Sequence, residues 1–202
     1  MNTQGKQLLA SIKSTRNFLG DLSQLLMTAD GLMGENSWES IWGSSALGEL
    51  SYTVSSGHLW MPREATRPYR NKGNYPNVIA MVAVLLDDYQ LDYKLLEPVV
   101  SASYFVFPKE TAEEKIRLDF SQCRWFGWSK VPTNGTPATI DDSDPRWKPT
   151  YVWKYMQVFG QPLVEVTNET VLKEKVIDPL LRLIKENKQI NAGEVTRSRL
   201  ES

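Results

Sequence analysis

The sequence predicts an α+β fold, in which an antiparallel sheet of about five strands is flanked by a long N-terminal helix and a C-terminal helix. Three observations lead to this expectation. Apolar residues recur at helical spacing at the start of the chain and again near its end. The segments between them alternate apolar and polar residues, or run continuously apolar, as strands do. Helices and strands are therefore segregated along the chain, which favours an antiparallel sheet over a doubly wound parallel one.

The first element is a helix expected from Gln4 to Met33. Its apolar positions follow a rhythm of four and three residues, which is the heptad pattern of a helix with one continuous apolar seam. Gly20 is a weak position inside this helix, and Gly31 and Gly34 are expected to mark its end. The residues of this heptad seam are Leu8, Ile12, Thr15, Leu19, Leu22, Leu26, Ala29 and Met33.

The strands are expected in the middle of the chain. Val78–Leu86 is continuously apolar and rich in β-branched residues, which predicts a central strand buried on both faces. The proline-rich segments Pro62–Pro76 and Pro132–Pro149 are expected to be loops. Gly160 and Pro162 should interrupt the sheet late in the chain. The other expected strands are Leu50–Val54, Pro98–Phe107, Phe120–Val131, Tyr151–Phe159 and Leu163–Val166.

The last element is a helix from Glu169 to Ile184. Asn168 can cap it by accepting backbone N–H bonds, and Pro179 should kink or restart it because proline has no N–H. Residues 187–202 show no apolar period and are expected to be a flexible tail. The chain is therefore expected to be one domain, residues 1–186, followed by that tail.

Composition narrows the classes of protein that fit. The chain has 202 residues with 23 basic and 24 acidic side chains, and this balance argues against a dedicated nucleic-acid coat protein. Its single cysteine, Cys123, excludes an internal disulfide and a cysteine-based zinc site. We see no secretory leader and no apolar run of about 20 residues, so we expect a cytoplasmic protein of a bacterium or phage, with no membrane contact.

Recognisable catalytic motifs are missing from the sequence. Neither the glycine-rich phosphate loops nor the GxSxG motif of serine hydrolases occurs. His58 is the only histidine, and neither it nor Cys123 has a partner set visible in the sequence. The balance is against an enzyme, and we predict no catalytic residues, no cofactor and no metal site.

Binding residues are easier to nominate. The chain has seven tryptophans; those in strand-like segments, Trp125, Trp128 and Trp153, are expected in the core. Tryptophans in irregular segments are expected to anchor a protein interface. The predicted partner-binding residues combine four residues from the first part of the heptad seam with three of these tryptophans. They are Leu8, Ile12, Leu19 and Leu22, with Trp38, Trp42 and Trp147.

A second candidate surface is basic. Arg63, Arg67, Arg70 and Lys72 crowd into ten residues that also hold Tyr69, so an anion site is possible there, with nucleic acid as its partner. The alternative is a solvated loop whose charges are balanced by acids elsewhere, as the net charge of −1 requires.

These observations favour a non-enzymatic accessory subunit of a multiprotein system. A helix of about 30 residues is about 45 Å long, so part of its seam should overhang the sheet and bind another chain, either a second copy or a different subunit. The competing view is that the C-terminal helix covers the seam. Two other functions remain open: a sensor that holds a small molecule between sheet and helices, and a metal-dependent nuclease using Asp87, Asp88 and Asp92, where Asp92-x-Lys94 fits half of a nuclease motif.

Overall fold

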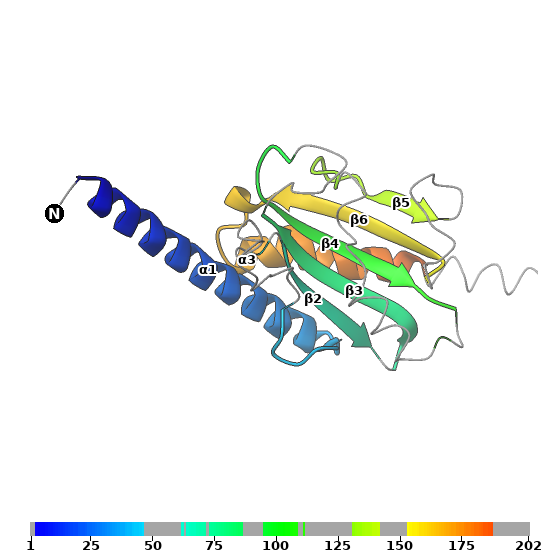
Figure 1. Ribbon diagram of the computed structural model, residues 1–202. Coiled ribbons are helices and arrows are strands. Elements are labelled where there is room, and N and C mark those ends of the chain that lie inside the picture. The colour runs from blue at the N-terminus through cyan, green and yellow to red at the C-terminus, as the bar shows by residue number, and fades with distance from the viewer. Residues whose placement is uncertain are drawn as a thin grey trace, which may run out of the picture.

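The computed structural model describes residues 3–46, 62, 64–71, 73–86, 95–108, 111, 131–141 and 153–187. Its strands form one six-stranded antiparallel sheet in the order β1-β2-β3-β4-β6-β5. The N-terminal and C-terminal helices share one face of that sheet, and the N-terminal helix runs far past its edge (Figure 1). The predicted α+β fold, with an antiparallel sheet and a helix at each end, is confirmed.

Helix α1 spans Thr3–Glu35, close to the predicted range. It ends in the hydrogen-bond pattern of a Schellman motif: the N–H of Trp38 bonds the carbonyl of Met33 at 3.0 Å, and the N–H of Ser37 bonds that of Gly34 at 2.9 Å. Ser37 takes the left-handed conformation that this motif needs, with φ 63°. Gly31 and Gly34 lie in the last turns of the helix, as expected, but the left-handed position after it is held by a serine and not by a glycine.

The sheet begins with β1 (Glu39–Ser40) and β2 (Glu64–Asn71). The loop predicted from Pro62 to Pro76 was wrong over these eight residues. Pro68 is tolerated because its backbone faces β1, where its carbonyl accepts from the N–H of Ile41 at 3.0 Å. The N–H and the carbonyl of a strand residue point to the same side, so the N–H that proline lacks would also face β1, and its absence removes no bond to β3.

The centre of the sheet is β3 (Tyr75–Leu85) paired with β4 (Val99–Val106). Both were predicted, and both are buried on the two faces of the sheet. Their register places Val82 opposite Ala102 and Leu85 opposite Val99. A central strand with apolar residues on both faces must be covered on both sides, which explains its continuous apolar run.

The far side of the sheet is β6 (Tyr155–Pro162) with β5 (Ala138–Asp141) at the edge. Two expectations fail here. The strand runs through Gly160 instead of stopping there. A glycine is needed at this position because a Cβ would lie 2.6 Å from a methyl carbon of Val131 and 2.7 Å from one of Val99. The loop predicted from Pro132 to Pro149 contains β5, since Ile140 is buried in the core.

The chain leaves the sheet at Leu163–Glu165, which forms a 3-10 turn in place of the expected strand. The turn is needed to reach the C-terminal helix, residues 169–187, which comprises α3 (Glu169–Leu172), the π-helical segment η4 (Lys173–Ile177) and helical residues 178–187. Asn168 caps it as predicted, by accepting from the N–H of Val171 at 3.0 Å. The irregularity predicted at Pro179 appears just before it, as the π-helical segment.

Two apolar layers hold the fold together. One lies between the sheet and the two helices, and joins Leu26 and Met33 of α1 to Leu180 and Ile184 of the C-terminal helix. The other covers the opposite face and includes Trp153, which was predicted to be core and meets the ring of Phe105 edge-on at 5.8 Å.

Some predicted segments lie outside the described residues. They are the strand expected at Leu50–Val54, the strand expected at Phe120–Val131 except for Val131 itself, and the tail from 188. The core assignments of Trp125 and Trp128 fall in the second of these segments and stay predictions.

Candidate functional site

Helix α1 changes character half-way along its length. From Leu22 onward the heptad seam faces the sheet and the C-terminal helix, and Leu22, Leu26, Ala29 and Met33 are at most 7% exposed. The first half of α1 projects away from the body (Figure 1). We call residues Thr3–Gly20 the extension; of these, Phe18 and Leu19 still touch the body. The overhang predicted from the length of the helix is therefore present.

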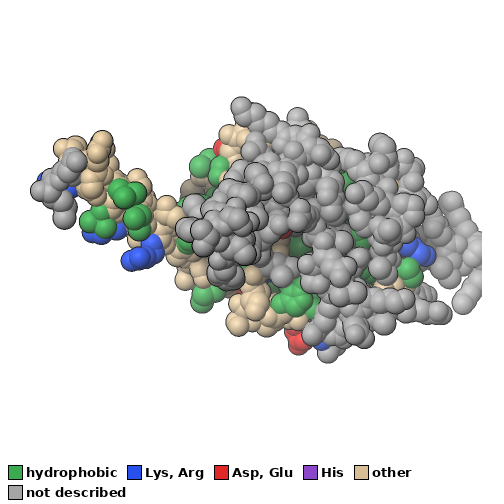
Figure 2. Space-filling model, viewed as in Figure 1, with side chains coloured by type: hydrophobic (Ala, Val, Ile, Leu, Met, Phe, Trp, Pro, Cys, Tyr) green, Lys and Arg blue, Asp and Glu red, His purple; other side chains and the backbone are tan. Residues whose placement is uncertain are grey.

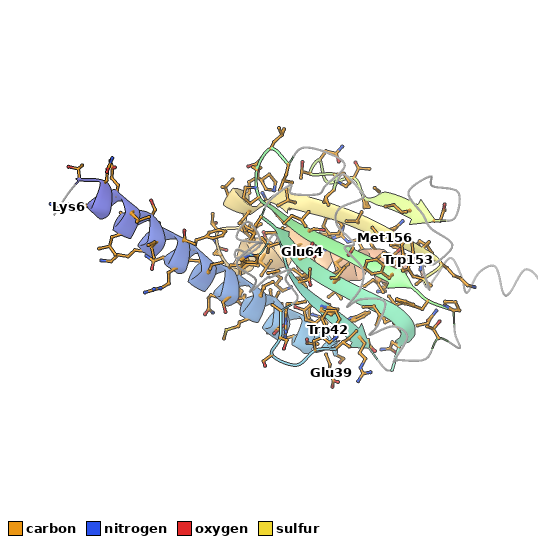
Figure 3. All side chains as sticks on the ribbon, in the orientation of Figure 1. Lys6, Glu39, Trp42, Glu64, Trp153 and Met156 are labelled. Atoms are coloured by element: carbon orange, nitrogen blue, oxygen red, sulfur yellow. The ribbon has the colours of Figure 1, made fainter. Side chains whose placement is uncertain are left out.

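The extension carries apolar side chains that the rest of the protein does not cover. Leu8, Leu9 and Ile12, which we call the outer patch, are 63%, 45% and 48% exposed. Figure 2 shows apolar and basic side chains side by side on this projecting segment. Lys6, whose side chain is exposed, lies near its outer end, away from the sheet (Figure 3).

The predicted partner-binding residues of the seam divide into two groups. Leu8 and Ile12 are exposed, as a partner-binding role requires. Leu19 is partly buried against the protein's own core, and Leu22 belongs to that core. The assignment of Leu22 to a partner interface was therefore wrong, because the C-terminal helix and the sheet already cover it, and the competing view holds for this half of the helix.

Where the extension meets the body, a groove of about 500 Å³ opens between α1 and the start of the C-terminal helix. It is open to solvent, and its floor is apolar while its rim carries the carboxylates of Asp21 and Glu169. Its apolar lining consists of Phe18, Leu22, Leu25, Leu163, Val166 and Leu172. The groove follows the outer patch along α1, because Leu22, a residue of the same heptad seam, is part of its lining.

The tryptophans nominated for an interface do not gather into one. Trp38 is buried and stacks on the ring of Tyr75, with centroids 5.7 Å apart, so its assignment to an interface was wrong. It closes the end of the core where α1 turns into the sheet. Trp42 is half-buried against the opposite apolar layer. Trp147 lies outside the described residues.

The basic segment also differs from its prediction, because Arg67 points inward. Its Nε donates to Asp30 Oδ1 at 2.9 Å and its Nη2 to Asp30 Oδ2 at 2.5 Å. The remaining donors reach two backbone carbonyls, Ser45 O at 2.5 Å and Gly43 O at 2.6 Å. Tyr69 donates its hydroxyl to Asp30 Oδ1 at 2.9 Å. We call this cluster the arginine clamp, since it ties α1, β2 and the chain after β1 together.

The electrostatics of the clamp follow from burial and pairing. Burial lowers the pKa of Arg67, but the hydrogen bonds and the charge of Asp30 outweigh that effect and leave the pKa raised. Burial, and then the negative charge of Asp30, raise the pKa of the Tyr69 hydroxyl. Arg67 therefore stays charged and is committed to Asp30, so it was wrongly placed on an open anion-binding loop. Arg70 is half-buried, and Arg63 and Lys72 lie outside the described residues.

Sequence reasoning missed the clamp. Arg67 and Tyr69 are two residues apart, the spacing that puts two strand side chains on one face, and this signal was available. Their partner Asp30 is 37 residues away from Arg67, and nothing local in the sequence connects them.

A second polar cluster lies between β4, β6 and β5. The hydroxyls of Tyr104 and Tyr155 are 3.2 Å apart, and Tyr104 donates to Gln157 Oε1 at 2.8 Å. Gln157 in turn donates to Thr139 at 3.0 Å. Burial is the main cause that raises the pKa of both tyrosines, so both stay neutral at physiological pH. Neutral phenols that bond one another stabilise the sheet and offer no base or nucleophile.

Metal chemistry gains no support from the part of the chain that can be described. No three acidic, histidine or cysteine side chains lie together there as a metal site would need. The proposed nuclease carboxylates Asp87, Asp88 and Asp92 lie outside that part, and so do His58 and Cys123. Among the described helices, none has both the length and the apolar character that crossing a membrane requires.

Comparison with known proteins adds no identity: no family model, no curated protein and no solved structure is significantly similar to this chain.

Proposed function

We propose that this protein is a non-enzymatic interaction subunit that binds a protein partner through the extension of α1. The observation that carries the proposal is the contrast along one helix. Leu8 and Ile12 are 63% and 48% exposed, whereas the same heptad positions are buried from Leu22 onward. Covering the outer patch is favourable by about 25 cal/mol for each Å² of apolar surface removed from water.

The helix itself supports this role. The extension holds two glycines, Gly5 and Gly20, and two serines, Ser11 and Ser14, which favour the helix less than alanine does. About 18 residues of such composition would be marginal as an isolated helix in water. Growth from the packed half of α1 removes the cost of nucleation. A partner that packs against the apolar side of the extension would therefore stabilise its helical state over the unfolded one.

The other candidate functions have less support. A sensor domain needs an enclosed pocket, and the groove beside Phe18 is open to solvent. Nucleic-acid binding by the segment around Arg67 has less support because the guanidinium of Arg67 is already paired with the carboxylate of Asp30. The nuclease alternative depends on carboxylates outside the described residues.

Site-specific photo-crosslinking in the protein's native host tests the proposal. A photoreactive residue in place of Leu9 should give one dominant crosslinked product, because this side chain sits in the outer patch. The same residue in place of Ser14, on the polar side of the extension, is the matched control and should give none. Adding Ile12→Asp should abolish the Leu9 product with the melting temperature unchanged. A Leu9 product that persists with Ile12→Asp, or no product at all, would contradict the proposal.

A further inference from the structure

The charge of the extension is one-sided. Between Thr3 and Gly20 the sequence has three cations, Lys6, Lys13 and Arg16, and no carboxylate. All three side chains are exposed. The first turn of α1 also lacks an acidic residue, so the partial positive charge of the helix N-terminus adds to the cations. The extension is thus a basic rod on a chain whose net charge is −1.

The arrangement of these charges indicates the shape of the occupant. At about 100° per residue, Leu8 and Ile12 lie within about 40° of one another around the helix, and Leu9, the third residue of the outer patch, lies about 100° from Leu8. Arg16 lies between Ile12 and Leu9, at about 80° from Leu8, and Lys13 and Lys6 follow at about 140° and 160°. The opposite flank holds Phe18 and uncharged polar residues. An apolar seam with its cations on one flank is the arrangement by which flanking charges select a partner helix.

The body limits how a partner can approach. The heptad positions that are exposed on the extension are the ones that pack on the sheet and the C-terminal helix further along, so the body stands on the same side of α1 as the outer patch. A partner helix can lie along the extension only until it reaches the groove at Phe18. There the rim is acidic, with Asp21 and Glu169. The surface therefore changes from basic to acidic along its length.

We propose, on the basis of the function proposed above, that the partner is an acidic amphipathic α-helix of another protein. Its leucine-like positions cover Leu8 and Ile12, its carboxylates face Lys13 and Arg16, and its end at the groove is uncharged or basic. A second copy of this chain fits less well, because two extensions side by side would bring six cations together. An anionic membrane surface matches the charge, but it is flat, and the body stands on the same side of α1 as the outer patch and holds a flat surface away from it.

Peptide binding to the full-length chain tests this proposal, with fluorescence anisotropy as the readout. The probe is a helical peptide with leucine at heptad positions a and d and glutamate on the flanks, and the comparison peptide has lysine on the same flanks. The glutamate peptide should bind at least about tenfold more tightly, and about 300 mM salt should weaken it several-fold. Lys13→Glu with Arg16→Glu should reverse the preference. Arg182→Glu with Lys185→Glu, an equal charge change on the exposed side of the C-terminal helix, should have no effect.

Four outcomes would overturn the acidic-helix proposal. Equal binding of both peptides would show that charge does not select the occupant. A concentration-dependent dimer in sedimentation, broken by Ile12→Asp, would assign the surface to a second copy. Binding to vesicles of anionic lipid without binding to the glutamate peptide would assign it to a membrane. If the Leu9 crosslink forms and is insensitive to the reversal at Lys13 and Arg16, the interaction function stands and the acidic partner is wrong.

Discussion

The arginine clamp should contribute more to stability than any exposed ion pair, and Asp30→Ala measures how much. The side chain of Arg67 is 5% exposed and that of Asp30 is 34% exposed. Removing one partner of a fully buried pair costs about 3–5 kcal/mol, and partial exposure of Asp30 lets water reach the guanidinium and lowers that figure. The hydroxyl of Tyr69 also loses its acceptor, which adds about 1 kcal/mol. We expect Asp30→Ala to lower the free energy of unfolding by about 3 kcal/mol.

Urea unfolding followed by tryptophan fluorescence is the assay, with the slope against urea checked for a two-state transition. The matched control is Lys173→Ala, which breaks an ion pair with Asp178 whose side chains are 46% and 41% exposed. That change should cost less than about 1 kcal/mol. The double variant Asp30→Ala with Arg67→Met should be less destabilised than the sum of its single changes by at least about 1 kcal/mol, because no charge is left buried.

The reasoning would be refuted by either of two results. If Asp30→Ala lowers the free energy of unfolding no more than Lys173→Ala does, then burial of the guanidinium does not make its ion pair more stabilising than an exposed one. If the two single costs simply add in the double variant, Asp30 and Arg67 do not act as a pair.

Three further predictions concern the sheet and its connections. Ser37→Gly should raise the free energy of unfolding by up to about 1 kcal/mol, because glycine adopts the left-handed φ without strain; chemical denaturation measures this. Gly160→Ala should lower it by about 1–3 kcal/mol, since the new Cβ would meet two valine methyl groups, and a loss below about 0.5 kcal/mol would show that the neighbours move aside. The pKa values of Tyr69, Tyr104 and Tyr155 are raised above the ordinary value of 10.0. Above about pH 10 the folded protein therefore keeps these protons, while the unfolded chain loses them. Stability should therefore be complete below about pH 10 and fall above it, by about 1.4 kcal/mol per pH unit for each tyrosine that ionises only when unfolded, and Tyr104→Phe should make the fall less steep.

The elements that sequence predicted are those whose signal is local. The heptad spacing of α1, the continuous apolar run of β3 and the capping asparagine at 168 each lie within a few neighbouring residues. The fold class followed from their order along the chain. For the site, helix length alone predicted that part of the seam would overhang.

The elements that sequence missed depend on partners far along the chain. The segment of β2 was expected to be a loop because of its prolines, but Pro68 turns its backbone toward the short β1 and Arg67 is buried by its pairing with Asp30. The strand through Gly160 reads as a break because the close approach of Val131 is not visible locally. Which half of the heptad seam is covered was also a question of tertiary packing, since Leu8 and Leu22 look alike in the sequence.

The body holds α1 at one end only, through the packed seam from Leu22 to Met33 and through the clamp, and this makes the helix a lever. Leu22 lies 14 residues from Leu8 along α1, or about 21 Å at 1.5 Å per residue. A rotation of about 5° about the packed end would move the outer patch by about 2 Å, enough to make or break van der Waals contact there. A small adjustment of packing between α1 and the body is thus amplified at the tip of the helix.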